Sequence, residues 1–215
     1  MSTFQRKILV VEDEPLLAAL IQDLLTGEGF KVATARNSVE ARKVADELDP
    51  DLALLDIELG DGPSGIDLAI ILREQNPGIG LVFLTHIPEP RVVGVDNRSI
   101  PKNAAYLVKD RIAESGLLRS AIDAALRDRV TRDLRDDKKS HALSEVSRSQ
   151  LDVLKLVALG RSNHEIAEER GTTVRAVENL VKRALEAANI DLNEGNTRVK
   201  AAREFIRVAG LPNDK

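Results

Sequence analysis

Cysteine and tryptophan are absent from this chain of 215 residues, and aromatic side chains make up only 2% of it. Without cysteine, disulfides, thiolate zinc sites and cysteine nucleophiles are excluded, which suits a reducing cytoplasm. Scarce aromatics disfavour recognition of single-stranded nucleic acid, which uses stacking platforms. No apolar run approaches about 18 residues, so neither a membrane-spanning helix nor a membrane partner is expected. These absences predict a soluble, cytoplasmic protein.

Aliphatic side chains must supply the core, because 43% of the residues are hydrophobic. The length suits two domains of about 100 residues each. Asp and Glu exceed Lys and Arg within residues 1–128, whereas residues 148–215 have a slight excess of Lys and Arg. This asymmetry favours nucleic acid as a partner of the second half only.

Residues 1–128 alternate short apolar runs with helix-like stretches. Helix signals include Pro15 at the start of one stretch and Asn37 or Ser38 as the cap of another. Prolines between Thr85 and Ala105 leave room for only a short helix. Continuous apolar strands that alternate with helices predict an α/β fold with a parallel sheet covered on both faces. The predicted strands are ILVV (8–11), KVATA (31–35), LALLD (52–56), LVFLT (81–85) and AYLVK (105–109), and the helices of this half are expected over 15–25, 38–48, 64–75 and from about 115 to at least 129.

Residues 129–145 carry dense mixed charge and few apolar side chains, as is typical of a solvated linker. Leu126, Val130 and Leu134 are spaced by four residues, so an extension of the preceding helix is the alternative.

From residue 146 onward the pattern is helical throughout. Ser147 and Gln150 fit a capping box, and Gly171 ends a short helix before a longer one over 173–188. A last helix is predicted over 197–208. Two helices joined by a tight turn favour a helix-turn-helix, so the second domain is predicted to be small and all-α.

Polar residues stand at the ends of four predicted strands. Glu12 and Asp13 follow the first strand, and Asp56 ends the third. Thr85 ends the fourth strand and Lys109 the fifth. Each of these residues taken alone is explained at least as readily as a polar cap of its strand end as by a functional role. Because ligands of an open parallel sheet bind beyond the carboxyl ends of its strands, the five together predict a site.

The chemistry that these side chains fit is phosphoryl transfer to a carboxylate. Converging carboxylates repel one another unless a cation lies among them, and Mg²⁺ takes carboxylate and phosphate oxygens. Asp56 is the candidate nucleophile, since carboxylates can form aspartyl phosphates. Lys109 would offset charge on the phosphoryl oxygens, and the Thr85 hydroxyl would donate a hydrogen bond to one of them. Glu14 is expected to be a solvated residue at a helix start.

The segments VVEDEP, LLDIELGDGPSG, FLT and YLVKD resemble the receiver domain of two-component response regulators across residues 5–128. The resemblance implies a five-stranded, doubly wound, flavodoxin-like fold, phosphorylated on Asp56 by a sensor histidine kinase. It implies no enzyme activity beyond the receiver's assistance to its own phosphorylation and dephosphorylation. The Mg²⁺ ligands that it implies are Glu12, Asp13, Asp56 and the main-chain carbonyl of Glu58.

The same resemblance assigns Thr85 and Lys109 the roles given above and makes Tyr106 the switch aromatic. Three features depart from the family pattern, and the first is Asp110 in place of the common proline after Lys109, so a cis peptide bond is not expected there. His86 stands where a small residue is usual, which would restrict access to Asp56. The proline-interrupted segment 86–103 makes the usual signalling surface around the fourth helix atypical.

The segment LKLVALGRSNHEIAEERGTTVRAVENLVKRALEAANI resembles the LuxR-type (NarL-type) helix-turn-helix, and the resemblance covers roughly residues 146–210. It implies that 173–188 is a recognition helix in the major groove of duplex DNA. The final helix, 197–208, would be a homodimer contact. By position, base contacts are implied for Glu178, Asn179 and Lys182, and phosphate contacts for Arg175 and Arg183.

The two resemblances together predict a response regulator that controls transcription. Its predicted parts are a receiver over 1–128, a linker over 129–145 and a DNA-binding domain over 146–215. One alternative is a phospho-independent DNA-binding regulator whose receiver merely dimerises. Another is a phospho-switched protein-interaction module that does not bind DNA. A metal-dependent phosphatase is the third, although no separate general acid or substrate-pocket motif is present.

Overall fold

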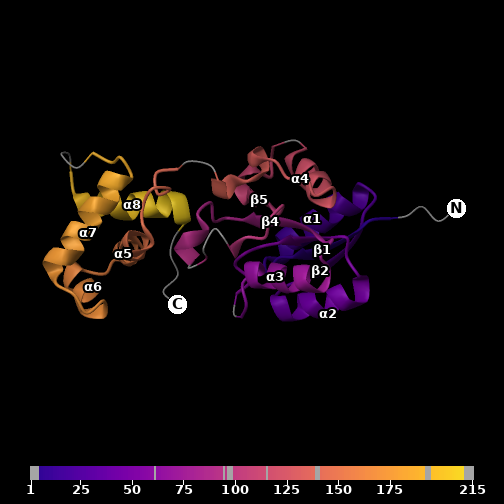
Figure 1. Cartoon of the computed structure of the whole chain (residues 1–215), viewed down its shortest axis with the longest axis horizontal. Coiled ribbons are helices and arrows are strands. Elements are labelled where there is room, and N and C mark those ends of the chain that lie inside the picture. The colour runs from indigo at the N-terminus through magenta and orange to yellow at the C-terminus, as the bar shows by residue number, and fades with distance from the viewer. Residues whose placement is uncertain are drawn as a thin grey trace. The chain divides into compact units, whose positions relative to one another are not determined.

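The computed structural model describes residues 5–60, 62–93, 95, 99–114, 116–138, 141–191 and 195–210. The chain forms two compact units, whose elements are labelled in Figure 1. The N-terminal unit consists of Met1–His86 and Arg98–Lys138, and the C-terminal unit of Ile87–Asn97 and Lys139–Lys215. The sequence predicts a division between residues 128 and 146. The units have other boundaries, because residues 87–97 belong to the C-terminal unit and residues 129–138 to the N-terminal unit.

The N-terminal unit is built on a five-stranded parallel sheet in the order β2-β1-β3-β4-β5. Strands β3 and β4 are buried along their whole length, because helices cover both faces of the sheet. This confirms the predicted doubly wound fold, and each strand end lies within one residue of its predicted place. The strands are β1 (Lys7–Val11), β2 (Lys31–Ala35), β3 (Leu52–Leu55), β4 (Gly80–Thr85) and β5 (Ala105–Val108).

Helices α1 (Pro15–Gly27) and α4 (Leu117–Leu126) cover one face of this sheet, and α2 (Ser38–Leu48) and α3 (Gly65–Gln75) cover the other (Figure 1). Local signals fix where these helices begin. The Asn37 side chain caps α2, and Ser64 forms a capping box with Asp67 at the start of α3. The predicted cap at Asn37 or Ser38 is thus Asn37.

The predicted extension of the helix after β5 is wrong, because α4 ends at Leu126. The chain instead forms two 3-10 turns, η4 (Arg132–Leu134) and η5 (Asp136–Lys138), which belong to the N-terminal unit. Leu134 is buried in the apolar core of that unit. The Asp136 carboxylate accepts the Val108 backbone N–H of the edge strand β5 at 2.9 Å and also pairs with Arg111. Residues 129–138 are therefore packed structure rather than a solvated linker.

The C-terminal unit contains four helices in its described residues: α5 (Arg148–Ala158), α6 (Asn163–Glu169), α7 (Val174–Ala187) and α8 (Thr197–Ala209). Ser147 forms the predicted capping box with Gln150, and Thr173 caps α7. The helices enclose one apolar core. The all-α prediction for this part is confirmed. No helix in the described ranges of either unit has the length and apolar character needed to cross a membrane.

Residues 87–93 contribute to that core although they lie between β4 and β5 in the sequence. Their only regular element is η1 (Pro90–Val93), a 3-10 turn. Ile87 and Val92 are buried and join the same apolar cluster as Leu143 and Val146. The sequence predicts a short helix between Thr85 and Ala105. Within the described residues of this segment, it does not form as an α-helix.

Candidate functional site

Three carboxylates converge beyond the carboxyl ends of β1 and β3. Glu12, Asp13 and Asp56 each place a carboxylate oxygen within 4.8 Å of the others. The main chain fixes them there, because the Asp56 N–H donates to the Val11 carbonyl at 2.9 Å and the Glu12 N–H donates to the Ala35 carbonyl at 3.0 Å. Oxygen donors at this spacing suit Mg²⁺, which accepts carboxylates from a protein and oxygens from phosphate and water.

Lys109, which follows β5, carries the positive charge of the site. Its Nζ lies 2.8 Å from both Glu12 Oε1 and Asp56 Oδ2, and all three side chains are buried. Burial alone would lower the pKa of Lys109, but its hydrogen bonds to Asp56 and Glu12 outweigh burial and raise it. Burial raises the pKa of Glu12. The hydrogen bond from Lys109 lowers this pKa, but by less than burial raises it. The ammonium group is thus held charged beside Asp56, where it can offset further negative charge.

Backbone N–H groups fix the orientation of Asp56. Its Oδ1 accepts from the Ile57 N–H at 2.6 Å and the Glu58 N–H at 3.3 Å, while Oδ2 faces Lys109. Gly65, the first residue of α3, lies against the backbone behind it. A Cβ added to Gly65 would stand 1.8 Å from the Asp56 carbonyl oxygen, so only glycine fits there.

The remaining predicted receiver residues lie on neighbouring elements. Thr85 ends β4 and is fully buried, and Tyr106 on β5 is buried with its ring centroid 6.0 Å from that of Phe83. His86 is exposed, and its Nε2 lies 3.8 Å from Oε1 of the exposed Glu14. The roles predicted for Thr85 and Tyr106, and the Mg²⁺ contact of the Glu58 carbonyl, stay predictions.

Helix α7 presents a polar face that includes the predicted DNA-contacting residues. Its buried stripe consists of Val177, Val181, Ala184 and Leu185. At 3.6 residues per turn, the face opposite this stripe carries exposed polar side chains of both charges, with the exposed Glu178 at its flank. These side chains are Arg175, Asn179, Lys182, Arg183 and Glu186.

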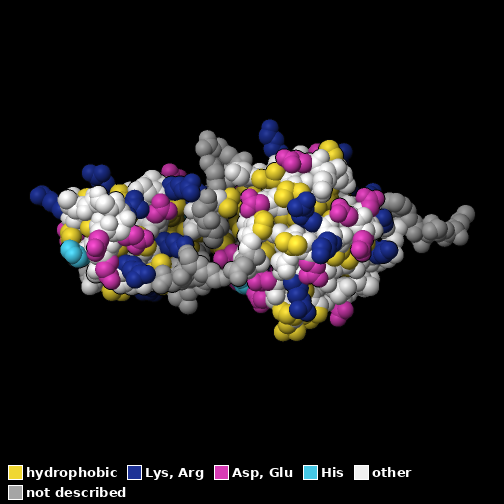
Figure 2. Space-filling model, turned by 90° about the horizontal axis from the view of Figure 1, so that it is seen from below, with side chains coloured by type: hydrophobic (Ala, Val, Ile, Leu, Met, Phe, Trp, Pro, Cys, Tyr) yellow, Lys and Arg dark blue, Asp and Glu magenta, His cyan; other side chains and the backbone are white. Residues whose placement is uncertain are grey.

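A hollow of about 560 Å³ adjoins this face and is lined in part by Asn179 and Arg183. Arg170 and Ser149 also line it, and Arg170 Nη2 donates to Ser149 Oγ at 2.9 Å. Sequence reasoning missed Arg170, although a basic residue directly before the Gly171 turn was a usable signal. Acidic and basic side chains are interspersed on both units over the face shown in Figure 2.

We expect Asp13→Ala to weaken Mg²⁺ binding by about tenfold or more, because it removes one of the three converging carboxylates. Asp13 is exposed, so the substitution disturbs no buried contact. Calorimetric titration of Mg²⁺ into the full chain measures the change. Asp23→Ala, which removes an exposed carboxylate of α1 outside the cluster, is the matched control. Equal affinities for the two variants would contradict the assignment.

Comparisons with known proteins show what the sequence and the fold of this chain are similar to. Residues 8–95 match the family model of the response regulator receiver domain. The DNA-binding response regulator MtrA of Mycolicibacterium smegmatis is 42% identical over 85 residues, which cover 40% of this chain and 36% of MtrA. The transcriptional regulatory protein LnrK of Bacillus subtilis is 26% identical over 203 residues, covering 82% of this chain and 90% of LnrK.

The structure of the two-component response regulator RcsB in a DNA complex has a similar fold, with a TM-score of 0.60 at 17% identity, covering 95% of this chain and 99% of that one. The match to MtrA spans only about a third of that relative's length. The N-terminal unit of this chain has the fold of a response regulator receiver domain, and its sequence is similar to that family over residues 8–95. In fold, the whole chain resembles a two-domain response regulator.

Proposed function

We propose that this chain is a response regulator of a two-component system in which a phosphoryl group on Asp56 controls binding of the C-terminal unit to duplex DNA. The observation that carries the proposal is that the Asp56 carboxylate lies 2.8 Å from the Lys109 ammonium group and within 4.8 Å of carboxylate oxygens of Glu12 and Asp13. A carboxylate so placed can accept a phosphoryl group while neighbouring groups manage the added charge.

Glu12, Asp13, Asp56 and the main-chain carbonyl of Glu58 would hold Mg²⁺, which supplies positive charge for the phosphoryl oxygens when bound. The donor is a phosphohistidine of a sensor histidine kinase. An Asp56 oxygen forms the new bond to phosphorus as the phosphorus–nitrogen bond of the donor breaks. Lys109 then contacts the phosphoryl oxygens, the Thr85 hydroxyl donates to one of them, and Tyr106 responds as the switch aromatic.

In the C-terminal unit, α7 would enter the major groove. Asn179, Lys182 and Glu178 would face the bases, and Arg175 and Arg183 the phosphates. Support comes from their exposure on α7, from the name of MtrA as a DNA-binding regulator and from the RcsB–DNA complex. A homodimer joined through α8 and a cytoplasmic location complete the proposal.

A second candidate is a phospho-switched module that binds protein rather than DNA. The acidic side chains of α7 favour it, since Glu186 lies 3.8 Å from Lys182 and Glu178 would repel phosphate.

The test is binding of the full chain to a pool of genomic duplex fragments, with and without Mg²⁺ and beryllofluoride as a phosphoryl mimic. We expect salt-sensitive binding that the mimic changes, and Asp56→Asn should remove the response to the mimic. Replacing both Arg175 and Lys182 by alanine should weaken binding about tenfold or more and reduce the salt slope by about two.

Arg127→Ala, which removes an exposed arginine of the receiver unit, is the matched control and should leave binding unchanged. Binding that ignores both the mimic and Asp56→Asn would point to the phospho-independent alternative. Absence of duplex binding in every state would favour the protein-interaction module.

A further inference from the structure

A segment from the middle of the receiver sequence is built into the C-terminal unit. We call residues 87–93 the strap. Only His86 separates it from the end of β4, yet it belongs to the C-terminal unit. Its Ile87 and Val92 side chains are 2% and 9% exposed and lie in the same apolar cluster as Leu143, Val146 and Leu151. The strap is thus core structure of the C-terminal unit and not a loop of the receiver.

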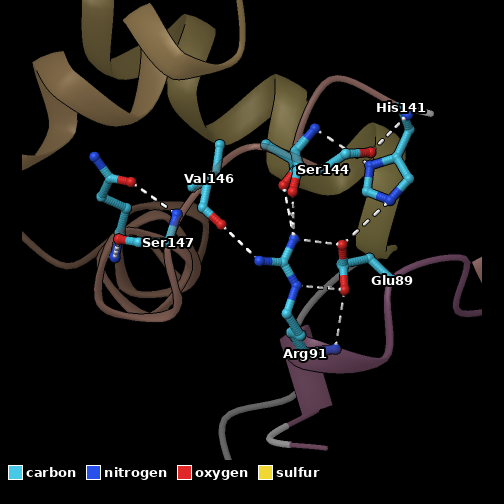
Figure 3. A network of polar contacts seen from close by, with 8 residues as sticks. Glu89, Arg91, His141, Ser144, Val146 and Ser147 are labelled. Atoms are coloured by element: carbon cyan, nitrogen blue, oxygen red, sulfur yellow. Dashed lines mark hydrogen bonds and ion pairs between the residues drawn. The ribbon is translucent and has the colours of Figure 1, made fainter. Parts of the chain in front are cut away.

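Arg91 fastens the strap to the turn that leads into α5 (Figure 3). Its guanidinium donates to the carbonyl oxygens of Val146 at 2.7 Å and of Leu143 and Ser144 at 3.0 Å each. Nε and Nη2 also donate to the two carboxylate oxygens of Glu89 at 2.8 and 2.7 Å. Planar, bidentate pairing of this kind fixes orientation as well as charge, and lysine cannot reproduce it.

Glu89 and His141 complete the network. Glu89 is 2% exposed, and its Oε2 lies 3.2 Å from His141 Nε2. His141 Nδ1 accepts the Leu143 backbone N–H at 3.2 Å, so Nε2 is the nitrogen that carries a proton toward Glu89. The strap therefore binds both ends of the turn over residues 141–147, as Figure 3 shows.

That turn sets where α5 begins, because Ser147 is the cap of the helix. Helix α5 packs on α7 and α8, and its Ser149 lines the hollow beside the polar face of α7. Displacing the strap would therefore disturb the support of the helix that we propose reads DNA.

The strap is also tied covalently to the receiver site. His86 alone separates Thr85 from Ile87 in the chain. Pro88 and Pro90 restrict the backbone on either side of Glu89, so few conformations are open to the chain that joins Thr85 to Arg91. A phosphoryl group on Asp56 would bring new acceptor oxygens and negative charge next to the buried end of β4.

From these contacts we propose that the strap is the coupling element of the protein. On this view a phosphoryl group on Asp56 acts through Thr85 and His86 on the strap, and Arg91, Glu89 and His141 are positioning residues that pass the change to the turn over 141–147. The proposal rests on the proposed function, because it takes phosphorylation of Asp56 as its input.

The test lengthens the covalent link without touching either set of contacts. Two glycines are inserted after His86 in the full chain, and in a control the same insertion is placed after Lys138, where the chain passes between the units again. Backbone hydrogen exchange is then measured with Mg²⁺ with and without beryllofluoride, in wild type and in both variants. Residues around Asp56 report binding of the mimic, and residues 141–151 report the response of the C-terminal unit.

We expect the mimic to protect the surroundings of Asp56 in all three proteins. Exchange over 141–151 should change severalfold in wild type and in the Lys138 control, and less than twofold after the His86 insertion. A full response after the His86 insertion would overturn the coupling role of the strap, as would equal loss in both variants. A mimic that changes nothing around Asp56 would instead overturn the proposed function, and the coupling with it.

Arg91→Lys provides a second test. This substitution keeps the positive charge of residue 91 but not the bidentate geometry. It should reduce the response over 141–151 while the mimic still protects Asp56. An unchanged response in this variant would show that Arg91 has no positioning role.

Discussion

Gly65→Ala is expected to abolish phosphoryl uptake at Asp56, although residue 65 carries no functional group. The added Cβ would lie 1.8 Å from the Asp56 carbonyl oxygen and 3.2 Å from the Ile57 Cα, both backbone atoms that no rotamer change can move. Gly65 also donates its N–H to the Ile57 carbonyl at 3.0 Å. Either the start of α3 or the segment after β3 must shift, and the orientation of the Asp56 carboxylate depends on that segment.

The expected cost to the receiver unit is about 2–4 kcal/mol of unfolding free energy, on the scale of severe overpacking. Mass spectrometry after incubation with a small phosphoryl donor measures uptake, and urea unfolding measures stability. Gly27→Ala is the control, since its added Cβ would meet nothing within 4 Å at the end of α1. A variant at Gly65 that takes up phosphoryl as readily as the Gly27 variant would contradict the close approach.

Acid is expected to destabilise the C-terminal unit through Glu89. Burial would raise the pKa of this carboxyl, but hydrogen bonds from Arg91 and His141 outweigh burial and lower its pKa to about 2 from the ordinary 4.5. The folded state thus binds fewer protons than the unfolded state between these values. The stabilisation is complete above about pH 4.5 and is lost as the pH falls toward 2. A shift of this size corresponds to about 3 kcal/mol.

Urea unfolding of the full chain between pH 7 and pH 3 measures this dependence in the transition of the C-terminal unit. Glu89→Gln should lower stability at pH 7, because it leaves the partly buried Arg91 charge without its carboxylate, and should flatten the acid dependence. Glu145→Gln is the matched control, since Glu145 is an exposed carboxylate of the same turn. Parallel pH profiles for Glu89→Gln and wild type would refute the assignment.

The receiver site could be predicted from the sequence because its residues are tied to strand ends. Each apolar run predicts a strand, and parallel strands bring their carboxyl ends to one edge of the sheet. The convergence of Glu12, Asp56 and Lys109 can therefore be predicted without knowledge of any side-chain contact. Helix caps were predictable for a similar reason, since Asn37 and Ser147 act on backbone groups two or three residues away.

The strap and residues 129–138 could not be predicted in this way. Prolines in 86–103 indicate that a long helix is absent, but they do not indicate what the segment packs against. Arg91 bonds to a carbonyl 55 residues away, and Asp136 to an N–H 28 residues away. The charges of residues 129–138 resemble those of a solvated linker, because buried and exposed ion pairs use the same residue types.

The split construction of the C-terminal unit limits how such a protein can be recombined. Residues 139–215 are contiguous and look like a cassette, but Ile87, Arg91 and Val92 complete their core and turn from within the receiver sequence. Joined to a foreign receiver, the cassette would have an open apolar gap, and three carbonyl groups of its first turn would lose their Arg91 donor. An exchange of the C-terminal unit, in evolution or by engineering, would therefore have to include both the β4–β5 connection and the C-terminal helices.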